Sequence, residues 1–259
     1  MPTTSFLETV TVIETREVAK GTFVTKVKAP SIARNVKAGQ FVMVSFPEST
    51  DPLLPRAFSV CDAFEDSVSL LYVAVGKGTR RISKLLPGDP MVFNGPLGKG
   101  FPNMSGQKTF HVVVGGSGAA LIPILDRTAK SRGASINFYY GARTGSQLVK
   151  FDGVENVNHA TDDGSEGFHG NVVELLKKKI DGDSSGVVFA CGPTPMLVAL
   201  QREVGVSVET YLSVETPMAC GMGLCQGCPV RNAGDGDYYL ACKDGPVFRS
   251  TEISFEMKP

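Results

Sequence analysis

Short apolar-rich runs typical of strands, with turn residues such as Gly and Pro between them, dominate the first hundred residues. These runs lie at residues 10–14, 22–28, 40–45, 57–61, 68–75 and 90–94. No helical period interrupts these runs for long, and strands of this length at this spacing indicate a small antiparallel barrel. One helix is predicted at 79–86, where Ile82, Leu85 and Leu86 share a face before Pro87-Gly88.

The pattern changes after Lys108, where longer apolar runs alternate with helical periods. The predicted elements are strands at 111–114, 135–140 and 187–190 and helices at 119–132, 171–179 and 195–203. Strands that alternate with helices predict a parallel sheet with helices on its faces. We therefore expect a multi-domain β plus α/β fold, with a barrel domain over residues 1–104, an α/β domain over 105–207 and a small segment over 208–259.

The composition is that of an ordinary globular protein. Of the 259 residues, 42% are hydrophobic and 20% are charged, and 26 basic side chains balance 26 acidic ones. This balance points neither to nucleic acid nor to an anionic membrane surface as a partner. No apolar run approaches the roughly 20 residues that span a bilayer, and residues 1–11 lack a basic region followed by an apolar one, so we expect a cytoplasmic protein.

Four of the six cysteines crowd into the C-terminal segment. Cys220, Cys225 and Cys228 follow the spacing C-x4-C-x2-C, and thirteen residues separate Cys228 from Cys242. In a chain without a secretion signal, such crowding favours a metal site over disulfides. The spacing is that of plant-type ferredoxins, in which four thiolates bind a [2Fe-2S] cluster.

The loop that joins these cysteines is rich in glycine. Gly221, Gly223 and Gly227 are expected to let the backbone approach the cluster and turn its amides toward the sulfurs. The alternative is a structural zinc site, which usually takes its ligands from two C-x2-C pairs, whereas this segment has only one. Cys61 and Cys191 stand alone in apolar surroundings, where small buried core residues are expected.

Two short motifs in the barrel region carry side chains suited to a flavin. Pro55-Arg56-Ala57-Phe58-Ser59 offers an arginine for a diphosphate, an aromatic ring for stacking and a hydroxyl for a hydrogen bond. Gly76-Lys77-Gly78-Thr79 opens the predicted helix, where free amides suit phosphate. Taken singly, both motifs are weak signals, and a surface position for Arg56 and a core position for Phe58 are then the favoured interpretations.

A glycine turn stands near the start of the predicted α/β domain. Gly115-Gly116-Ser117-Gly118 lies between a strand and a helix, as a pyrophosphate turn does, although it is not G-x-G-x-x-G and a tight turn without a ligand is the alternative. The acidic residue expected about 20 positions further on, which would accept the ribose hydroxyls of NAD, is missing. Arg143 near that place suits either solvent or the 2′-phosphate of NADP, so both nucleotides stay open.

Taken together, these motifs resemble the ferredoxin-reductase-like flavoproteins. The resemblance lies in the order R-x-F-S, G-x-G-T, the junction Gly95-Pro96-Leu97-Gly98-Lys99-Gly100-Phe101 and a nucleotide-type sheet. With the cysteine loop and Cys242-Lys243-Asp244-Gly245-Pro246-Val247-Phe248, almost the whole chain is similar to the electron transfer subunits of heteromeric dihydroorotate dehydrogenases. The cysteine segment is the most specific part of this resemblance.

The resemblance implies cofactors and the residues that hold them. It implies FAD at Arg56, Ala57, Phe58, Ser59, Leu71, Tyr72, Val73, Gly78 and Thr79. It implies a nicotinamide nucleotide, NAD rather than NADP, at Gly115, Gly116, Gly118, Cys191, Gly192 and Pro193, which places Cys191 in the hydride-transfer pocket. Many relatives carry tyrosine at position 58, so the ring is kept here but a hydroxyl is lost. No general acid or base is expected.

Electron transfer is the function that this resemblance implies. FAD would exchange a hydride with the nicotinamide and single electrons with the cluster. The partner would be an FMN-containing catalytic subunit that oxidises dihydroorotate in pyrimidine biosynthesis, in a heterotetramer. Alternatives are the equivalent subunit of a hydrogenase, sulfide dehydrogenase or ferredoxin–NADP transhydrogenase, and a free-standing reductase. A non-catalytic module that senses metal or redox state is an alternative from another class.

Overall fold

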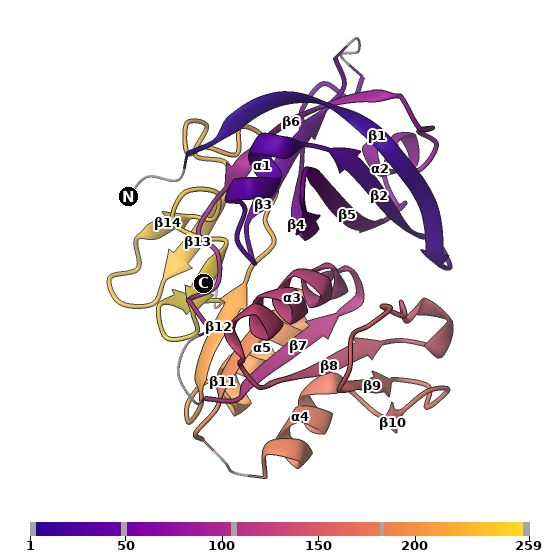
Figure 1. Cartoon of the computed structure of the whole chain (residues 1–259). Coiled ribbons are helices and arrows are strands. Elements are labelled where there is room, and N and C mark those ends of the chain that lie inside the picture. The colour runs from indigo at the N-terminus through magenta and orange to yellow at the C-terminus, as the bar shows by residue number, and fades with distance from the viewer. Residues whose placement is uncertain (1–3, 48–50, 105–107, 182–183, 256–259) are drawn as a thin grey trace.

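The structure, a computed structural model, describes residues 4–47, 51–104, 108–181 and 184–255. Figure 1 shows a barrel (indigo to purple) over a layered domain of strands and helices (magenta to orange), with the C-terminal segment (yellow) beside them. The predicted boundary at residue 105 falls within 105–107, which lies outside the described residues. Within the described ranges, no helix is long and apolar enough to cross a bilayer.

Six antiparallel strands close into the N-terminal barrel in the order β1-β2-β5-β4-β3-β6, which confirms the predicted architecture. Their bounds are β1 Phe6–Ala19, β2 Thr22–Lys28, β3 Phe41–Ser45, β4 Arg56–Phe64, β5 Ser67–Val73 and β6 Pro90–Leu97. Inward-facing side chains such as Val60, Leu70 and Phe93 are completely buried and form the core of the barrel. A short helix that was not predicted, α1 (Pro30–Asn35), buries Ile32 against the barrel.

The helix predicted at 79–86 is wrong at both ends, because α2 spans Lys77–Ile82. It begins earlier because the Gly76 amide donates to the Thr79 hydroxyl at 2.9 Å, which closes the first turn. It ends earlier because Ile82 is the only fully buried member of the predicted apolar face, while Leu86 is 67% exposed. The apolar spacing therefore overstated the length of the packed helix.

Seven strands form the second sheet, in the order β10-β9-β8-β7-β11-β12-β15. They are β7 Phe110–Gly115, β8 Ile136–Ala142, β9 Val157–Thr161, β10 Phe168–His169, β11 Val187–Cys191, β12 Glu209–Ser213 and β15 Val247–Arg249. Neighbours run parallel except that β15 is antiparallel to β12. β7 lies between β8 and β11, so the strand order reverses there, and ligands of such sheets bind outside the carboxyl ends at this point.

Helices and short 3-10 turns connect these strands. They are η1 Gly116–Leu121, α3 Ile122–Arg132, η2 Gly145–Gln147, α4 Val172–Ile180 and α5 Thr194–Glu203. The predicted parallel sheet with helices is thus confirmed, with the helix predicted at 119–132 beginning as a 3-10 turn. β9, β10, β12 and β15 are strands that the sequence pattern did not predict.

The C-terminal segment is tied to both of the other parts. β13 (Pro229–Asn232), β14 (Tyr238–Leu240) and β16 (Ile253–Ser254) form a small sheet of their own, whereas β12 and β15 belong to the large sheet. On the barrel side, the Lys99 amide donates to the Gly245 carbonyl at 2.5 Å. These contacts hold the cysteine loop in place relative to both the barrel and the sheet.

Candidate functional site

The four clustered cysteines come together in two pairs. The Sγ atoms of Cys228 and Cys242 lie 3.2 Å apart. Cys220 accepts a hydrogen bond from the Cys225 amide at 3.4 Å and contacts the Cys225 thiol. In the described residues, no group of three or more Cys, His, Asp or Glu side chains converges to hold a single metal ion. Two pairs of thiolates fit a cluster with two irons, so this donor set suits [2Fe-2S].

Backbone amides point at the sulfurs, as the sequence predicted. The Met222 amide donates to Cys220 Sγ at 3.5 Å, and the Gly223 amide donates to Cys242 Sγ at 3.1 Å. Burial opposes ionisation of Cys220, but the amides of Cys225 and Met222 outweigh it and lower the pKa of this thiol to about 6. The loop therefore favours the thiolate at Cys220, the form that binds iron, whereas burial and the neighbouring Cys228 raise the pKa of Cys242 to about 12.

Two of the three loop glycines need to be glycine. Gly221 and Gly223 have φ angles of +73° and +85°, and a Cβ on Gly221 would lie 2.5 Å from the Cγ atom of Met43. Gly227 has no left-handed φ, and a Cβ there would meet only Cys225 Sγ at 3.5 Å. Instead Gln226 is left-handed, with φ of +56°. The special dihedral expected at Gly227 is therefore wrong, because the neighbouring residue makes the turn.

The predicted flavin residues gather on β4, β5 and the start of α2. Arg56 lies against Gly78, where a Cβ would come within 3.3 Å of the Arg56 Cγ atom. The guanidinium of Arg56 donates to the carbonyls of Leu54 and Pro55 in its own loop. The structure thus brings the predicted diphosphate-binding arginine beside the predicted phosphate turn.

The aromatic residue of the flavin motif is buried in the barrel. Phe58 meets Tyr72 edge-on, with ring centroids 5.7 Å apart. Tyr72 is buried as well; its hydroxyl bonds to the hydroxyl of Thr25 at 2.9 Å, and burial raises its pKa to about 12. Of the other predicted residues, Leu71 is buried, Ser59 is half-buried and Ala57 is exposed. The Tyr72 side chain is a barrel contact, so a role for Tyr72 toward FAD rests on its backbone.

A cavity of about 820 Å³ lies between the barrel and the carboxyl ends of the sheet strands. This volume is within the range of small-molecule sites. Of the predicted residues, those that line the cavity are Val73 from the barrel and Gly115, Gly116 and Pro193 from the α/β domain. The helix start in η1 has no side-chain cap, and Gly116 and Ser117 are exposed. Their amides are therefore available to a pyrophosphate.

Gly118, Cys191 and Gly192 lie behind this lining. A Cβ on Gly118 would come within 2.1 Å of the Cys191 carbonyl oxygen, so the turn packs directly on the end of β11. Cys191 is 2% exposed. Burial first, and the charge of Glu215 second, raise the pKa of its thiol to about 12 against the effect of a hydrogen bond with Ser213. The thiol is therefore neutral at physiological pH.

Several cavity residues were missed by the sequence analysis. The main ones are Lys20 and Thr22 of the β1–β2 hairpin and Asp162, Asn171 and Glu203 of the α/β domain. Asp162 directly follows β9, and Arg143 directly follows β8, the strand that pairs with β9. The sequence pattern did not predict β9, so it gave no reason to place Asp162 at the carboxyl end of a strand. Cys61, by contrast, is a buried core residue as predicted, and burial raises the pKa of its thiol.

Curated relatives of this chain are named electron transfer subunits. Residues 215–254 match the family model described as the iron-sulfur cluster binding domain of dihydroorotate dehydrogenase B. The electron transfer subunit of dihydroorotate dehydrogenase B (NAD(+)) from Desulforamulus reducens is 36% identical over 248 residues, covering 92% of this chain and 95% of that protein. The corresponding subunit from Geobacillus thermodenitrificans is 34% identical, covering 95% of this chain and 98% of that protein.

One solved structure extends the similarity to the whole fold. It is an NADH-dependent reduced ferredoxin-NADP oxidoreductase studied for flavin-based electron bifurcation. The two chains superpose with a TM-score of 0.81 at 26% identity, over 95% of this chain and 90% of the other. From the identity with the curated relatives over nearly its full length, the chain belongs to the family of electron transfer subunits of dihydroorotate dehydrogenase B.

Proposed function

We propose that this chain passes electrons between NAD(H) and a catalytic dihydroorotate dehydrogenase subunit through FAD and a [2Fe-2S] cluster. The observation that carries the proposal is the paired cysteine loop, which packs against barrel strand β3 through Gly221 and Met43 in a chain that also has a nucleotide-sized cavity. When bound, FAD would take the hydride that converts NADH to NAD⁺ and release its two electrons singly to the cluster.

The residues of the chain bind and orient these groups. Arg56 and Gly78 would hold the diphosphate of FAD, with Phe58 and Ser59 beside the flavin ring. Gly116 would offer its amide to the pyrophosphate of the nucleotide. Cys220, Cys225, Cys228 and Cys242 would be the ligands of the two irons.

The surface beside the cysteine loop suits a protein partner. A groove of about 370 Å³, which we name the cluster groove, is lined by Leu7, Met43, Ser45, Pro55, Val92, Asn94, Ala219, Cys220, Met222 and Leu224. Leu7 and Leu224 are each 77% exposed and Met222 is 48% exposed. Exposed apolar side chains that gather around a groove are typical of interfaces. We assign this face to the FMN-containing catalytic subunit, in an assembly of two copies of each chain.

The test is reconstitution of the full chain with that subunit. Wild-type protein is expected to reduce NAD⁺ when dihydroorotate is supplied, and Leu224→Glu to lose this activity while NADH still reduces a dye. Val206→Glu, which places the same charge at an apolar residue 80% exposed after α5, is the matched control and should retain both activities. A Leu224→Glu protein that still binds the partner and reduces NAD⁺ would contradict the assignment.

The solved structure at 26% identity favours a second candidate, an NADH-linked subunit of a ferredoxin–NADP oxidoreductase. The same reconstitution separates the two functions. If reduced ferredoxin and NADPH exchange electrons with the chain while dihydroorotate has no effect in the presence of the catalytic subunit, this second function replaces the first.

A further inference from the structure

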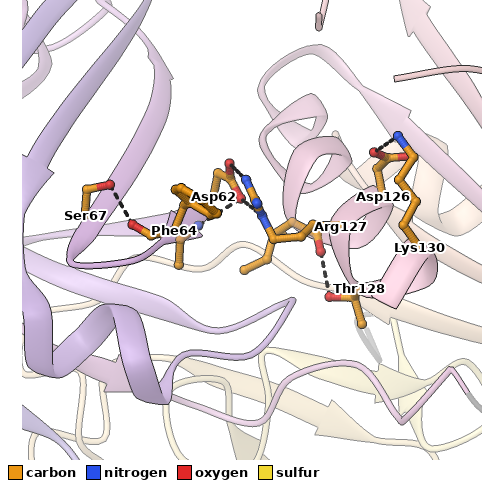
Figure 2. Close-up of polar contacts among 9 residues, drawn as sticks. Asp62, Phe64, Ser67, Asp126, Arg127, Thr128 and Lys130 are labelled. Atoms are coloured by element: carbon orange, nitrogen blue, oxygen red, sulfur yellow. Dashed lines mark hydrogen bonds and ion pairs between the residues drawn. The ribbon is translucent and has the colours of Figure 1, made fainter. Parts of the chain in front are cut away.

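An ion pair joins the barrel to the first helix of the α/β domain. Asp62 is on β4 and Arg127 is on α3. The Arg127 Nε atom lies 2.9 Å from Asp62 Oδ1, and Nη2 lies 2.5 Å from Oδ2. Figure 2 shows the guanidinium facing the carboxylate across the gap between the two elements. Two parallel charge-assisted hydrogen bonds fix both the distance and the orientation of the groups they join.

Further contacts hold both members of this pair. The guanidinium lies over the ring of Phe64, with 4.8 Å from its central carbon to the ring centroid. Asp62 Oδ1 also accepts a hydrogen bond from the Ala63 amide at 2.9 Å. The hydrogen bond with Asp62 raises the pKa of Arg127. The Asp62 side chain is 24% exposed and that of Arg127 is 45% exposed. The pair is therefore ordered by several contacts but still accessible to salt.

The position of the pair links two parts of the functional site. Asp62 follows Ser59 by three residues on β4, the strand of the flavin motif. Arg127 is on α3, which continues directly from η1 and the glycine turn. η1 contacts both β4 and β5, and α3 contacts β4. The ion pair thus joins the strand that would carry the flavin to the helix whose beginning would carry the nucleotide.

We propose that Asp62 and Arg127 are positioning residues that set the nicotinamide against the flavin by fixing α3 to β4. This inference rests on the proposed function. The pair lies outside the residues that line the nucleotide cavity, so its loss should leave nucleotide affinity nearly unchanged while hydride transfer slows. Transfer is sensitive to small displacements, because a misplacement of about 1 Å can cost a factor of about 100 in rate.

The experiment uses the full chain loaded with flavin and cluster, under anaerobic conditions. Rapid-mixing absorbance gives the rate constant of flavin reduction and the dissociation constant for NADH, with protiated and 4-deuterated NADH compared. Arg127→Gln and Asp62→Asn should each lower the rate constant about tenfold, and Arg127→Lys, which keeps the charge, should lose less. Arg132→Gln, at the end of the same helix, is the control and should behave as wild type.

A second readout reports on the positioning itself. Hydrogen–deuterium exchange in β4 and α3 should rise in Arg127→Gln, and high salt should slow flavin reduction in wild type but not in the variant. If the pair contributed only to stability, Arg127→Gln would change the unfolding midpoint. The kinetic isotope effect on flavin reduction and the effect of salt on its rate would then be the same as in wild type. That result would overturn the proposal.

The outcomes also separate this inference from the proposed function. If NADH fails to reduce the flavin of the wild-type chain, both fail. If NADH reduces wild type and Arg127→Gln at the same rate, with equal exchange in β4 and α3, only the positioning role is overturned. A tenfold slower rate at unchanged NADH affinity supports it.

Discussion

Replacing Gly118 with alanine should force the glycine turn away from the end of β11. A Cβ at this position would lie 2.1 Å from the Cys191 carbonyl oxygen, 2.6 Å from its carbonyl carbon and 3.0 Å from the Gly192 nitrogen. All three atoms belong to the backbone, which cannot swing aside as a side chain can. Because ordinary contact begins at 3.4 Å, the two segments must separate by more than an ångström.

The cost follows from this overlap. Overpacking a buried site costs about 1–3 kcal/mol, and we expect Gly118→Ala to lose that much free energy of unfolding. The affinity for NADH should fall at least about tenfold, since the amides of the turn no longer face the cavity as they do in wild type. Urea unfolding and equilibrium dialysis with NADH measure the two effects on the loaded full chain.

Gly116→Ala is the matched control in the same turn. A Cβ on Gly116 meets nothing within 4 Å, so only its left-handed φ of +53° is unfavourable for alanine, at about 1 kcal/mol. Its NADH affinity should change far less than that of Gly118→Ala. If Gly118→Ala unfolds at the wild-type midpoint and binds NADH with wild-type affinity, the close approach of the turn to β11 does not shape the nucleotide site.

Three further predictions concern single side chains. Asp162→Ala should raise kcat/KM for NADPH about tenfold relative to that for NADH, because a carboxylate in the cavity repels a 2′-phosphate. Asp163→Ala, outside the cavity lining, should leave this ratio unchanged. An equal NADPH-to-NADH ratio in Asp162→Ala and wild type would refute this role. Cys228→Ser should purify with less iron and sulfide than wild type, whereas Cys61→Ala, in the barrel core, should keep both; a full complement in Cys228→Ser would exclude it as a ligand. The hydrogen bond from Lys108 is the main cause that lowers the pKa of Glu209 below its usual 4.5. The ionised Glu209 carboxylate therefore stabilises the folded protein above pH 4.5. This stabilisation is lost as the pH falls through the lower pKa that Glu209 has in the folded state. Glu209→Gln should flatten this acid dependence in unfolding measurements, and an unchanged pH profile would contradict it.

The sequence predicted those features that depend mainly on neighbouring residues, namely the barrel strands and the cysteine loop. Short apolar-rich runs between turn residues predicted β2, β4 and β5, because side chains such as Val27, Val60 and Leu70 are buried in the barrel core. The cysteine spacing predicted a site of four thiolates, because a short loop brings Cys225 to Cys220 and the pairing of β13 with β14 brings Cys242 to Cys228. The predictions failed where a neighbour takes over a local role, as Gln226 does for Gly227 and the Gly76–Thr79 contact does for the start of α2.

Long-range features had no local signal. β12 and β15 join the large sheet from the C-terminal segment, and only the completed fold pairs Leu212 with Phe248. Asp62 and Arg127 are 65 residues apart in sequence. From the sequence alone each would be predicted to be a solvent-exposed charge, because only the fold brings β4 next to α3. Asp162 was overlooked for the same reason, since its place beside Arg143 depends on the pairing of β9 with β8.

An anaerobic titration with NADH, on protein whose flavin, iron and sulfide have been quantified, tests the central claim most directly. We expect one FAD, two irons and two sulfides per chain, with NADH bleaching both the flavin and the iron–sulfur absorbance. Complete reduction should take more NADH than the flavin alone consumes, because the cluster accepts a further electron. Zinc in place of iron, with no bound flavin and no spectral change on adding NADH, would contradict the account.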